Sequence, residues 1–233
     1  MIELLHQIEQ IDTQIFLFFN GFHNVYWDYF MMIFSDRFVW VPFYASFIFV
    51  LLKNFPVKVV MSTIVVITLI ILFSDQTASG ILKPLVARMR PSNPDNPISP
   101  MVHVVQGYRG GRYGFPSSHA ANAWSMAFFA QYLVRRSKLT IFLCLWALIT
   151  SYSRMYLGVH YFGDILIGTL IGFLYATLYY YIFQYFLRKH TERFKPNHDI
   201  RFASVPIITG LVSIWVIICT SGILSFYNNT ALN

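Results

Sequence analysis

Three short stretches of the sequence carry side chains that could bind and transfer a phosphate group. In the first, Lys83 and Arg90 are seven residues apart, so a helix would place them on one face. In the second, Pro116-Ser117-Ser118-His119, serines stand directly before an apolar run. Serine is a favoured N-cap, and the free N–H groups and positive dipole of a helix N-terminus attract anions. Arg154, in the third stretch, adds another permanent cation, and arginine binds phosphoryl oxygens through two parallel hydrogen bonds.

Two histidines accompany these cations. His160 and Asp164 are four residues apart, so a helix would bring the carboxylate close enough to orient the imidazole. An imidazole held in this way can attack phosphorus, because the acid fixes its tautomer and stabilises the developing positive charge. His119 can then protonate the leaving oxygen as a general acid. The three stretches together predict a phosphoryl-transfer site in which electrostatic positioning supplies most of the rate enhancement.

Each stretch alone also has a plainer explanation. His119 could be an interfacial residue, Arg154 an anchor at the membrane surface, and Lys83 and Arg90 a further pair of interfacial cations. The chemical interpretation is favoured because the elements that carry the three stretches are all predicted to present them on one face of the protein.

The composition predicts a membrane protein. Of the 233 residues, 56% are apolar and 12% are charged, whereas soluble domains carry about 25% charged residues. So few charges cannot cover a soluble domain of this size, and the same composition excludes disorder and a disulfide scaffold. Lys and Arg number 17 against 10 Asp and Glu, and this net charge of +7 would suit nucleic acid or anionic lipid as a partner.

Six apolar stretches reach, or nearly reach, the length of about 20 residues that a transmembrane helix needs. We therefore expect an all-α, polytopic transmembrane helical bundle of about six spans. The fourth stretch is short, and the serines and tyrosine that follow must complete it at an interface. The expected spans are Phe38–Leu52, Val57–Ser79, Ser118–Val134, Leu139–Tyr152, Tyr161–Leu187 and Val205–Tyr227.

The positions of the cations predict the orientation of the bundle. Ten of the 17 lie in three alternate loops, beginning near Lys53, Arg135 and Arg188, and the positive-inside rule makes that side cytoplasmic. The loops 80–116 and 153–160 then share the outer, in a bacterium periplasmic, face of the inner membrane, and all three chemical stretches lie there. Nucleic acid is disfavoured as a partner, because no contiguous basic face is left.

The N-terminal segment Met1–Ser35 differs from the predicted spans. Polar residues from Asn20 to Asp28 interrupt its apolar run, which favours an amphipathic interfacial helix; a seventh span at about Thr13–Ile33 is the alternative. No cleavable signal peptide is predicted. We expect three regions: this segment, a catalytic core at 36–187, and a basic cytoplasmic loop with the last transmembrane helix at 188–233.

The pattern K-x6-R-P, P-S-x-H and S-R-x5-H-x3-D resembles the signature of the type 2 phosphatidic acid phosphatase (PAP2) superfamily, over roughly residues 35–190. The resemblance implies a helical bundle and a metal-independent phosphatase, without a cofactor, that works through a phosphohistidine. It implies His160 as the nucleophile, Asp164 as its partner and His119 as the general acid. The implied phosphate ligands are Lys83, Arg90, Ser117, Ser118 and Arg154.

One position departs from the family pattern, which usually reads P-S-G-H. Ser118 stands at the glycine; it keeps the backbone N–H but adds a side chain, so it is the least secure of the phosphate ligands. Arg109 and Arg112, in a glycine-rich loop, either contact the substrate head group or are ordinary loop surface. The head-group interpretation favours a large or multiply charged lipid.

The predicted partners are the bilayer and a phosphorylated membrane lipid; the sequence does not predict an oligomeric state. Lipid A phosphate and undecaprenyl pyrophosphate are favoured, with phosphatidylglycerol phosphate and phosphatidic acid as alternatives. A non-catalytic transporter or lipid-binding protein would use the same cations but would not need His160 and Asp164. A vanadate-dependent peroxidase has a similar set of residues, but those proteins are soluble.

Three other features are open to two interpretations each. Asp75, at the outer end of the second expected span, is either functional or hydrogen-bonded between helices. Gly168 and Gly172 form a G-x-x-x-G motif that serves close packing within the bundle or dimerisation. His103 is expected on the loop surface, and Arg37 and Arg88 have no predicted role.

Overall fold

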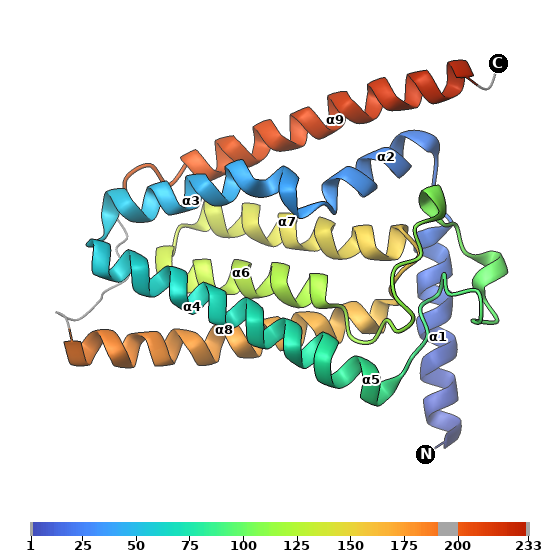
Figure 1. Cartoon of the computed structure of the whole chain (residues 1–233), viewed down its shortest axis with the longest axis horizontal. Coiled ribbons are helices and arrows are strands. Elements are labelled where there is room, and N and C mark those ends of the chain that lie inside the picture. The colour runs from blue at the N-terminus through green and yellow to red at the C-terminus, as the bar shows by residue number, and fades with distance from the viewer. Residues whose placement is uncertain (1, 191–199, 232–233) are drawn as a thin grey trace.

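The computed structural model describes residues 2–190 and 200–231, and the named secondary-structure elements in these residues are helices. Apart from α1, the longer helices lie side by side in a bundle (Figure 1). Helix α6 packs most extensively on α8 and α7, α4 packs on α6 and α8, and α9 covers α2 and α3. The longer helices are α1 (Ile2–Asn20), α2 (Val25–Phe34), α3 (Val41–Asn54), α4 (Val57–Asp75), α6 (Ser118–Val134), α7 (Ser137–Tyr156), α8 (Phe162–His190) and α9 (Val205–Ala231).

Short helices continue or connect these elements. After α4 the helix goes on without a break through the π-helical η2 (Gln76–Leu82) into α5 (Lys83–Val86). The 3-10 helix η1 (Arg37–Trp40) leads into α3, and η3 (Ser99–Met101) and η4 (Val105–Gly107) lie in the long loop before α6. The all-α, multi-pass prediction is confirmed.

The expected number of six spans is too high. In the described residues four helices are long and apolar enough to cross a membrane, and a fifth span results if a bent pair is counted as one. The expected span Ser118–Val134 is helix α6. At 17 residues it is shorter than the four qualifying helices, and it lies against α4, α7 and α8. The four helices are Val57–Val86, Ser137–Tyr156, Phe162–Leu187 and Val205–Ala231.

The first expected span is part of the bent pair. Helix α2 and the stretch Arg37–Asn54 meet at 62°. The break follows from local polar contacts: the side chain of Asp36 accepts a hydrogen bond from the N–H of Phe38 and starts η1 as a new helix. The predicted segment Met1–Ser35 thus comprises two helices, of which α2 packs on α9 and α7.

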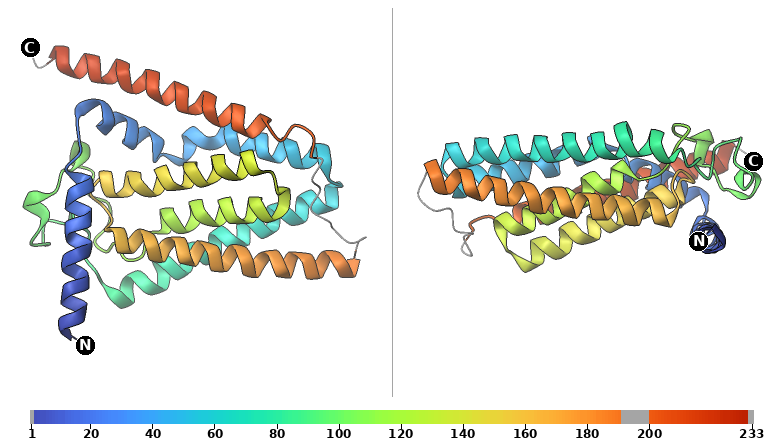
Figure 2. Two further views of the ribbon diagram at one scale, coloured as in Figure 1. Left: turned by 180° about the vertical axis from the view of Figure 1, so that it is seen from behind. Right: turned by 90° about the horizontal axis from the view of Figure 1, so that it is seen from below.

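Helix α1 runs across the end of the bundle rather than along it (Figures 1 and 2). A turn at residues 21–24 separates it from α2, so the alternative of one continuous span at Thr13–Ile33 is not formed. Its inner face buries Asp12, Phe16 and Asn20, one helical turn apart from each other. Asn20 donates hydrogen bonds to the backbone carbonyls of Met155 and Tyr156, at 3.2 and 2.9 Å, and so fixes α1 to the end of α7.

The G-x-x-x-G motif of α8 packs against α6. A Cβ atom on Gly168 would lie 2.4 Å from the carbonyl oxygen of Ser117, and one on Gly172 would lie 2.5 Å from that of Ala121. Real Cβ atoms do not approach so closely, so only glycine allows the two backbones to meet here. The motif therefore serves packing within the bundle, and it fixes the start of α6, which carries Ser117, Ser118 and His119.

The basic turns and the chemical residues lie at opposite ends of the bundle. The α3–α4 turn, with Lys53 and Lys58, and the α6–α7 turn, with Arg135 and Arg136, lie at the end away from α1 (Figure 1). The starts of α6 and α8 lie near α1. Most of the predicted basic loop after α8, residues 191–199, lies outside the described residues.

Candidate active site

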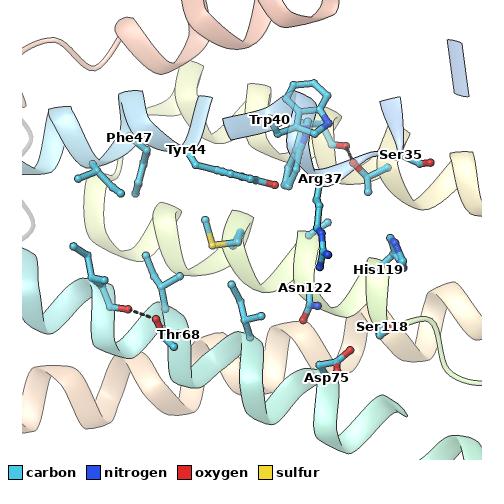
Figure 3. Close-up of a pocket in the computed structure, with 18 of the residues that line it drawn as sticks. Ser35, Arg37, Trp40, Tyr44, Phe47, Thr68, Asp75, Ser118, His119 and Asn122 are labelled. Carbon is cyan, nitrogen blue, oxygen red and sulfur yellow. Dashed lines mark hydrogen bonds between the residues drawn. The ribbon is translucent and has the colours of Figure 1, made fainter. Parts of the chain in front are cut away.

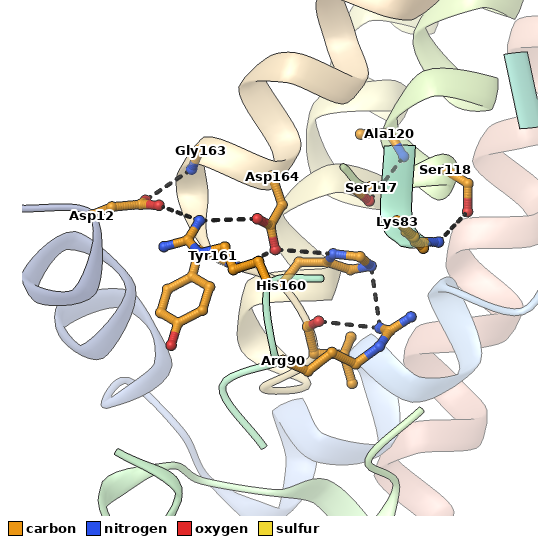
Figure 4. Close-up of polar contacts among 12 residues, drawn as sticks. Asp12, Lys83, Arg90, Ser117, Ser118, Ala120, His160, Tyr161, Gly163 and Asp164 are labelled. Atoms are coloured by element: carbon orange, nitrogen blue, oxygen red, sulfur yellow. Dashed lines mark hydrogen bonds and ion pairs between the residues drawn. The ribbon is translucent and has the colours of Figure 1, made fainter. Parts of the chain in front are cut away.

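His160 lies in the turn between α7 and α8 and is almost completely buried. Its Nδ1 atom is 3.3 Å from Oδ2 of Asp164, and its Nε2 atom is 3.2 Å from the guanidinium of Arg90 (Figure 4). Since a carboxylate only accepts and a guanidinium only donates, these contacts favour the tautomer with the proton on Nδ1. The lone pair of Nε2 then faces the arginine.

Asp164 sits in the first turn of α8, and the local fold fixes its position. The N–H of Tyr161 donates to Oδ2 at 3.0 Å, so the carboxylate also caps the start of the helix. The backbone carbonyl of Asp164 accepts a hydrogen bond from the N–H of Ser117 at 2.9 Å. This contact joins the start of α8 directly to the start of α6, so the two histidine-bearing segments are held together by backbone.

The surroundings of His160 favour a neutral imidazole. Burial lowers the pKa of His160 well below its usual value, and the positive charges of Arg90, Arg154 and Lys83 lower it further. These three cations therefore gather around the histidine although they come from two separate parts of the chain, Lys83 and Arg90 from one and Arg154 from the other. A neutral imidazole is the form that can act as a nucleophile.

The start of α6 forms one wall of the site. Ser117 is the N-cap, and its hydroxyl accepts a hydrogen bond from the N–H of Ala120 at 3.4 Å. The hydroxyl of Ser118 lies 3.4 Å from Nζ of Lys83 (Figure 4). Lys83 also donates to Ser79 at 3.1 Å, and Ser79 donates to Asp75 at 3.3 Å. Among the described residues, the hydrogen-bond partner of Asp75 is therefore Ser79, one turn further along the same continuous helix, and not a residue of a neighbouring helix.

Two buried arginines have donors to spare. The Nε atoms of Arg90 and Arg154 are buried and have no hydrogen-bond partner among the described residues. One terminal nitrogen of Arg90 donates a hydrogen bond to the carbonyl of Val159, and Arg154 donates to the hydroxyl of Tyr108 at 3.0 Å. Buried donors are normally paired, so unpaired ones beside a helix N-terminus indicate a binding site for an oxyanion such as phosphate.

The glycine-rich loop covers this cluster, but the charged groups of Arg109 and Arg112 contact other residues of the long segment before α6. A Cβ atom on Gly110 would lie 3.1 Å from the guanidinium of Arg90. Arg109 donates to the carbonyl of Ser92 and to the hydroxyl of Ser99, and Arg112 lies over the ring of Tyr113 at 5.6 Å. The structure therefore brings together the other eight predicted site residues around the starts of α6 and α8, and leaves these two at the surface.

His119 opens onto a cavity of about 500 Å³ that extends from the site between α3, α4 and α6 (Figure 3). Most of its lining is apolar, including Phe47, Ile67 and Met126. A few polar groups lie at the end near His119. Among them, Oδ1 of Asn122 is buried without a partner in the described residues, and Arg37 projects toward it. The polar lining residues at this end are Arg37, Asp75, Ser118, His119 and Asn122.

Several residues that sequence reasoning missed contact the predicted set. Tyr108 binds Arg154, and Arg88 binds Asp164 at 3.0 Å. Asp12, from α1, binds Arg88 at 2.8 Å. Arg88 lies between Lys83 and Arg90 in the first predicted stretch, so its positive charge could have indicated a role in the site. His103, expected at the surface, contacts Asp28 at 2.8 Å.

Comparisons with known proteins place the chain in a family. The family model of the PAP2 superfamily matches residues 58–188. The chain is 45% identical over 228 residues to a lipid A 4'-phosphatase of Bacteroides thetaiotaomicron, covering 95% of this chain and 98% of the relative. It is 33% identical over 182 residues to a lipid A 4'-phosphatase of Porphyromonas gingivalis, covering 78% and 76%. The crystal structure of Aquifex aeolicus LpxE has a similar fold, with a TM-score of 0.55 at 22% identity over 72% of this chain and 94% of that one.

Proposed function

The chain belongs to the PAP2 superfamily, and from this we propose that it is a membrane phosphatase that removes the 4'-phosphate of lipid A through a phosphohistidine intermediate. The observation that carries the chemistry is the buried pair of His160 and Asp164, with its nucleophilic nitrogen facing Arg90. The observation that supports the substrate is the similarity to a lipid A 4'-phosphatase along nearly the whole of both chains. Undecaprenyl pyrophosphate, the other substrate that the sequence favoured, has no specific support in the named relatives.

In the first step, Nε2 of His160 attacks the phosphorus and the bond between phosphorus and the sugar oxygen breaks. Asp164 stabilises the positive charge that develops on the imidazole. His119 gives its proton to the leaving sugar oxygen. The free donors of Arg90 and Arg154, the ammonium of Lys83 and the N-terminal N–H groups of α6 hold the equatorial phosphoryl oxygens.

In the second step, water attacks the phosphohistidine and releases inorganic phosphate. The bond between phosphorus and Nε2 breaks, and His119, now without its proton, accepts one from the water. The enzyme returns to its starting protonation state. His119 borders both the phosphate site and the cavity, which supports its action on the leaving group and then on the water that replaces it.

The apolar cavity supports a lipid as the leaving group. It begins at Ser118 and His119 and continues between helices whose apolar side chains line it. An acyl chain there could remain at membrane depth while the phosphate reaches the end of the bundle. The polar groups of Arg37, Asp75 and Asn122 lie between the two regions, where the sugar and its acyl linkages would pass.

The distribution of charge supports an active site on the outer face. The cations in the turns at residues 53–58 and 135–138 lie at one end of the bundle, and the turn from α7 to α8, which carries His160, lies at the other end (Figure 1). By the positive-inside rule that end is cytoplasmic, and the candidate site opens on the other side.

The test is phosphate release by the purified protein in detergent from lipid A that carries phosphates at both ends. We expect release of one phosphate, assigned to the 4' position by tandem mass spectrometry. The competing substrates are undecaprenyl pyrophosphate, phosphatidylglycerol phosphate and phosphatidic acid, each assayed at the same concentration. A clear preference for any of these would contradict the proposed substrate.

His160→Ala, at unchanged expression, separates the enzyme from a non-catalytic lipid-binding protein. It should abolish phosphate release, because no other group can form the phosphohistidine. Full activity in this variant would contradict the mechanism. Binding of lipid A without any phosphate release by the wild-type protein would favour the transport or binding function instead.

A further inference from the structure

Arg88 occupies the space between two carboxylates that belong to different helices. Its terminal nitrogen Nη1 lies 3.0 Å from Oδ1 of Asp164 and 2.8 Å from Oδ2 of Asp12 (Figure 4). The side chains of Asp164 and Asp12 are 0% and 11% exposed, so both ion pairs are well shielded from water. Oδ1 of Asp164 is thereby held by Arg88, while Oδ2 faces His160.

An aromatic ring also packs against the planar face of the Arg88 guanidinium. Its guanidinium lies over the ring of Tyr161, 3.8 Å from the centroid, as expected of a cation–π contact. The hydroxyl of Tyr161 in turn accepts a hydrogen bond from the amide of Asn96 at 3.0 Å. A guanidinium clamped by two carboxylates and a ring has little freedom to turn, so it can determine the orientation of the Asp164 carboxylate.

Asp12 ties this arrangement to α1. Its second oxygen, Oδ1, accepts the backbone N–H of Gly163 at 2.8 Å, at the start of α8. A Cβ atom on residue 163 would lie 2.8 Å from the same carboxylate, so a larger residue there would displace the Asp12 side chain. One turn further along α1, Phe16 packs edge-on against Tyr161 at 5.4 Å. The inner face of α1 is therefore docked on the segment that carries His160 and Asp164.

One exposed flank of α1 is apolar. Leu4, Ile8, Ile11 and Phe18 recur at helical spacing and are each more than half exposed. An amphipathic helix of this kind, lying across the end of a transmembrane bundle, fits the plane of the membrane interface (Figure 2).

We propose that Asp12 and Arg88 are positioning residues for the phosphatase reaction, and that the interfacial helix α1 thereby holds the His160–Asp164 pair in its working geometry. The inference rests on the proposed function, because it assigns a role within the same reaction. Neither residue touches the phosphate site itself; Arg88 acts through Asp164, and Asp12 acts through Arg88. The negative charge of Asp12 keeps the arginine between the two carboxylates, and the arginine keeps Asp164 aimed at Nδ1.

The experiment compares D12N, R88A and R88K with E9Q, whose parent Glu9 is an exposed acid of the same helix. We expect D12N to lower kcat on lipid A about tenfold and R88A about 100-fold, with KM within about twofold of wild type, since groups that orient a functional histidine typically contribute factors of this size. R88K should recover about tenfold over R88A, because the lysine ammonium can also donate to two carboxylates. E9Q should match wild type. Rapid-quench measurements with labelled substrate should show slower phosphohistidine formation in D12N.

Two further readouts separate positioning from general damage to the fold. In the R88A background D12N should cause no additional loss of kcat, because Asp12 acts through Arg88. D12N keeps the side-chain volume and the acceptor for Gly163, so it tests the proposal even if R88A does not fold. Unchanged kcat in D12N, or a rise in KM that accounts for the whole loss, would overturn the proposal. Loss of activity in E9Q as well as in D12N would also overturn it. If wild-type protein releases no phosphate from lipid A, the proposed function fails instead.

Discussion

At the scale of single residues, the environment of His160 determines which nitrogen can react. Nδ1 faces the carboxylate of Asp164 and Nε2 faces the guanidinium of Arg90, which cannot accept a proton. Only Nε2 therefore has a lone pair available, and it points toward the cluster of cations where a phosphate would bind. His119 has no such fixed partner within residues 2–190 and 200–231, and it opens onto the cavity. The two histidines are thus suited to different roles.

His119→Gln tests this division of roles. Hydrolysis of lipid A should fall by about 10²–10⁴-fold, the usual contribution of a general acid or base, because the sugar oxygen leaves poorly without a proton. An aryl phosphate with a good leaving group does not need that proton, so it should still phosphorylate His160. Phosphoenzyme should then accumulate, because the attack of water also lacks its base. Rapid-quench labelling measures both effects.

The control for this variant is His160→Gln, which should form no phosphoenzyme from either substrate. If His119→Gln slowed phosphorylation by the aryl phosphate as much as hydrolysis of lipid A, His119 would not be the general acid.

The lowered pKa of His160 predicts that the ligand-free protein becomes less stable in mild acid. Burial, with help from Arg90, Arg154 and Lys83, lowers the pKa of His160 in the folded state well below its usual value. The unfolded chain therefore takes up the proton first as the pH falls. The stabilisation is complete above about pH 6.5 and is lost below it, by up to about 1.4 kcal/mol per pH unit. Thermal unfolding in detergent between about pH 7.5 and pH 5.5 measures this loss.

His160→Gln removes this contribution to the titration of the site, so its melting temperature should fall less steeply over the same pH range. His6→Gln, at an exposed histidine of α1, should keep the wild-type slope. Equal slopes in wild type and His160→Gln would mean that other groups cause the acid sensitivity.

At the scale of helices, the sequence predicted contacts within a motif and missed contacts between distant ones. His160 and Asp164 are only four residues apart, so their contact could be predicted although His160 lies in the turn before α8, and so could the serine cap of α6. Arg88 and Asp12 are 76 positions apart in the chain, and their contact depends on how α1 crosses the bundle. Nothing in a local pattern indicates such a contact. The predicted count of six spans was wrong for a related reason. A run of apolar residues can be buried against lipid or against other helices, and α6 is buried against other helices.

The close approach of α8 to α6 should tolerate no side chain at residue 168. In Gly168→Ala the new Cβ atom would meet the carbonyl of Ser117 at 2.4 Å, so the helices must separate. Overpacking of this kind costs about 1–3 kcal/mol, which a lower melting temperature in detergent would report. Activity should fall too, because the displaced carbonyl belongs to the cap of the helix that carries His119.

Gly222→Ala in α9 is the matched control. A Cβ atom there meets nothing within 4 Å, so the change should preserve stability or raise it by up to about 1 kcal/mol through the higher helix propensity of alanine. Equal melting temperatures for the two alanine variants would contradict the packing argument.

At the scale of the whole molecule, the bundle separates a polar reaction from an apolar substrate anchor. The phosphate site lies at the end covered by α1 and the long loop, while the cavity continues from it between α3, α4 and α6. A lipid that occupies both regions at once would pass His119, which lines the cavity. The cavity should therefore contribute to recognition of the lipid without contributing to phosphoryl transfer.

Ile67→Trp tests this separation, because Ile67 lines the cavity from α4 at a distance along the helix from Asp75 and Lys83. A tryptophan there fills apolar space that the acyl chains need, so kcat/KM for lipid A should fall about tenfold or more, corresponding to a loss of about 1.4 kcal/mol of binding. Hydrolysis of a water-soluble aryl phosphate should stay at the wild-type rate. Val65→Trp, on the exposed side of the same helix, controls for the added bulk. A parallel loss on both substrates would mean that the cavity supports the fold of the catalytic site, and wild-type activity on lipid A would mean that the chains lie elsewhere.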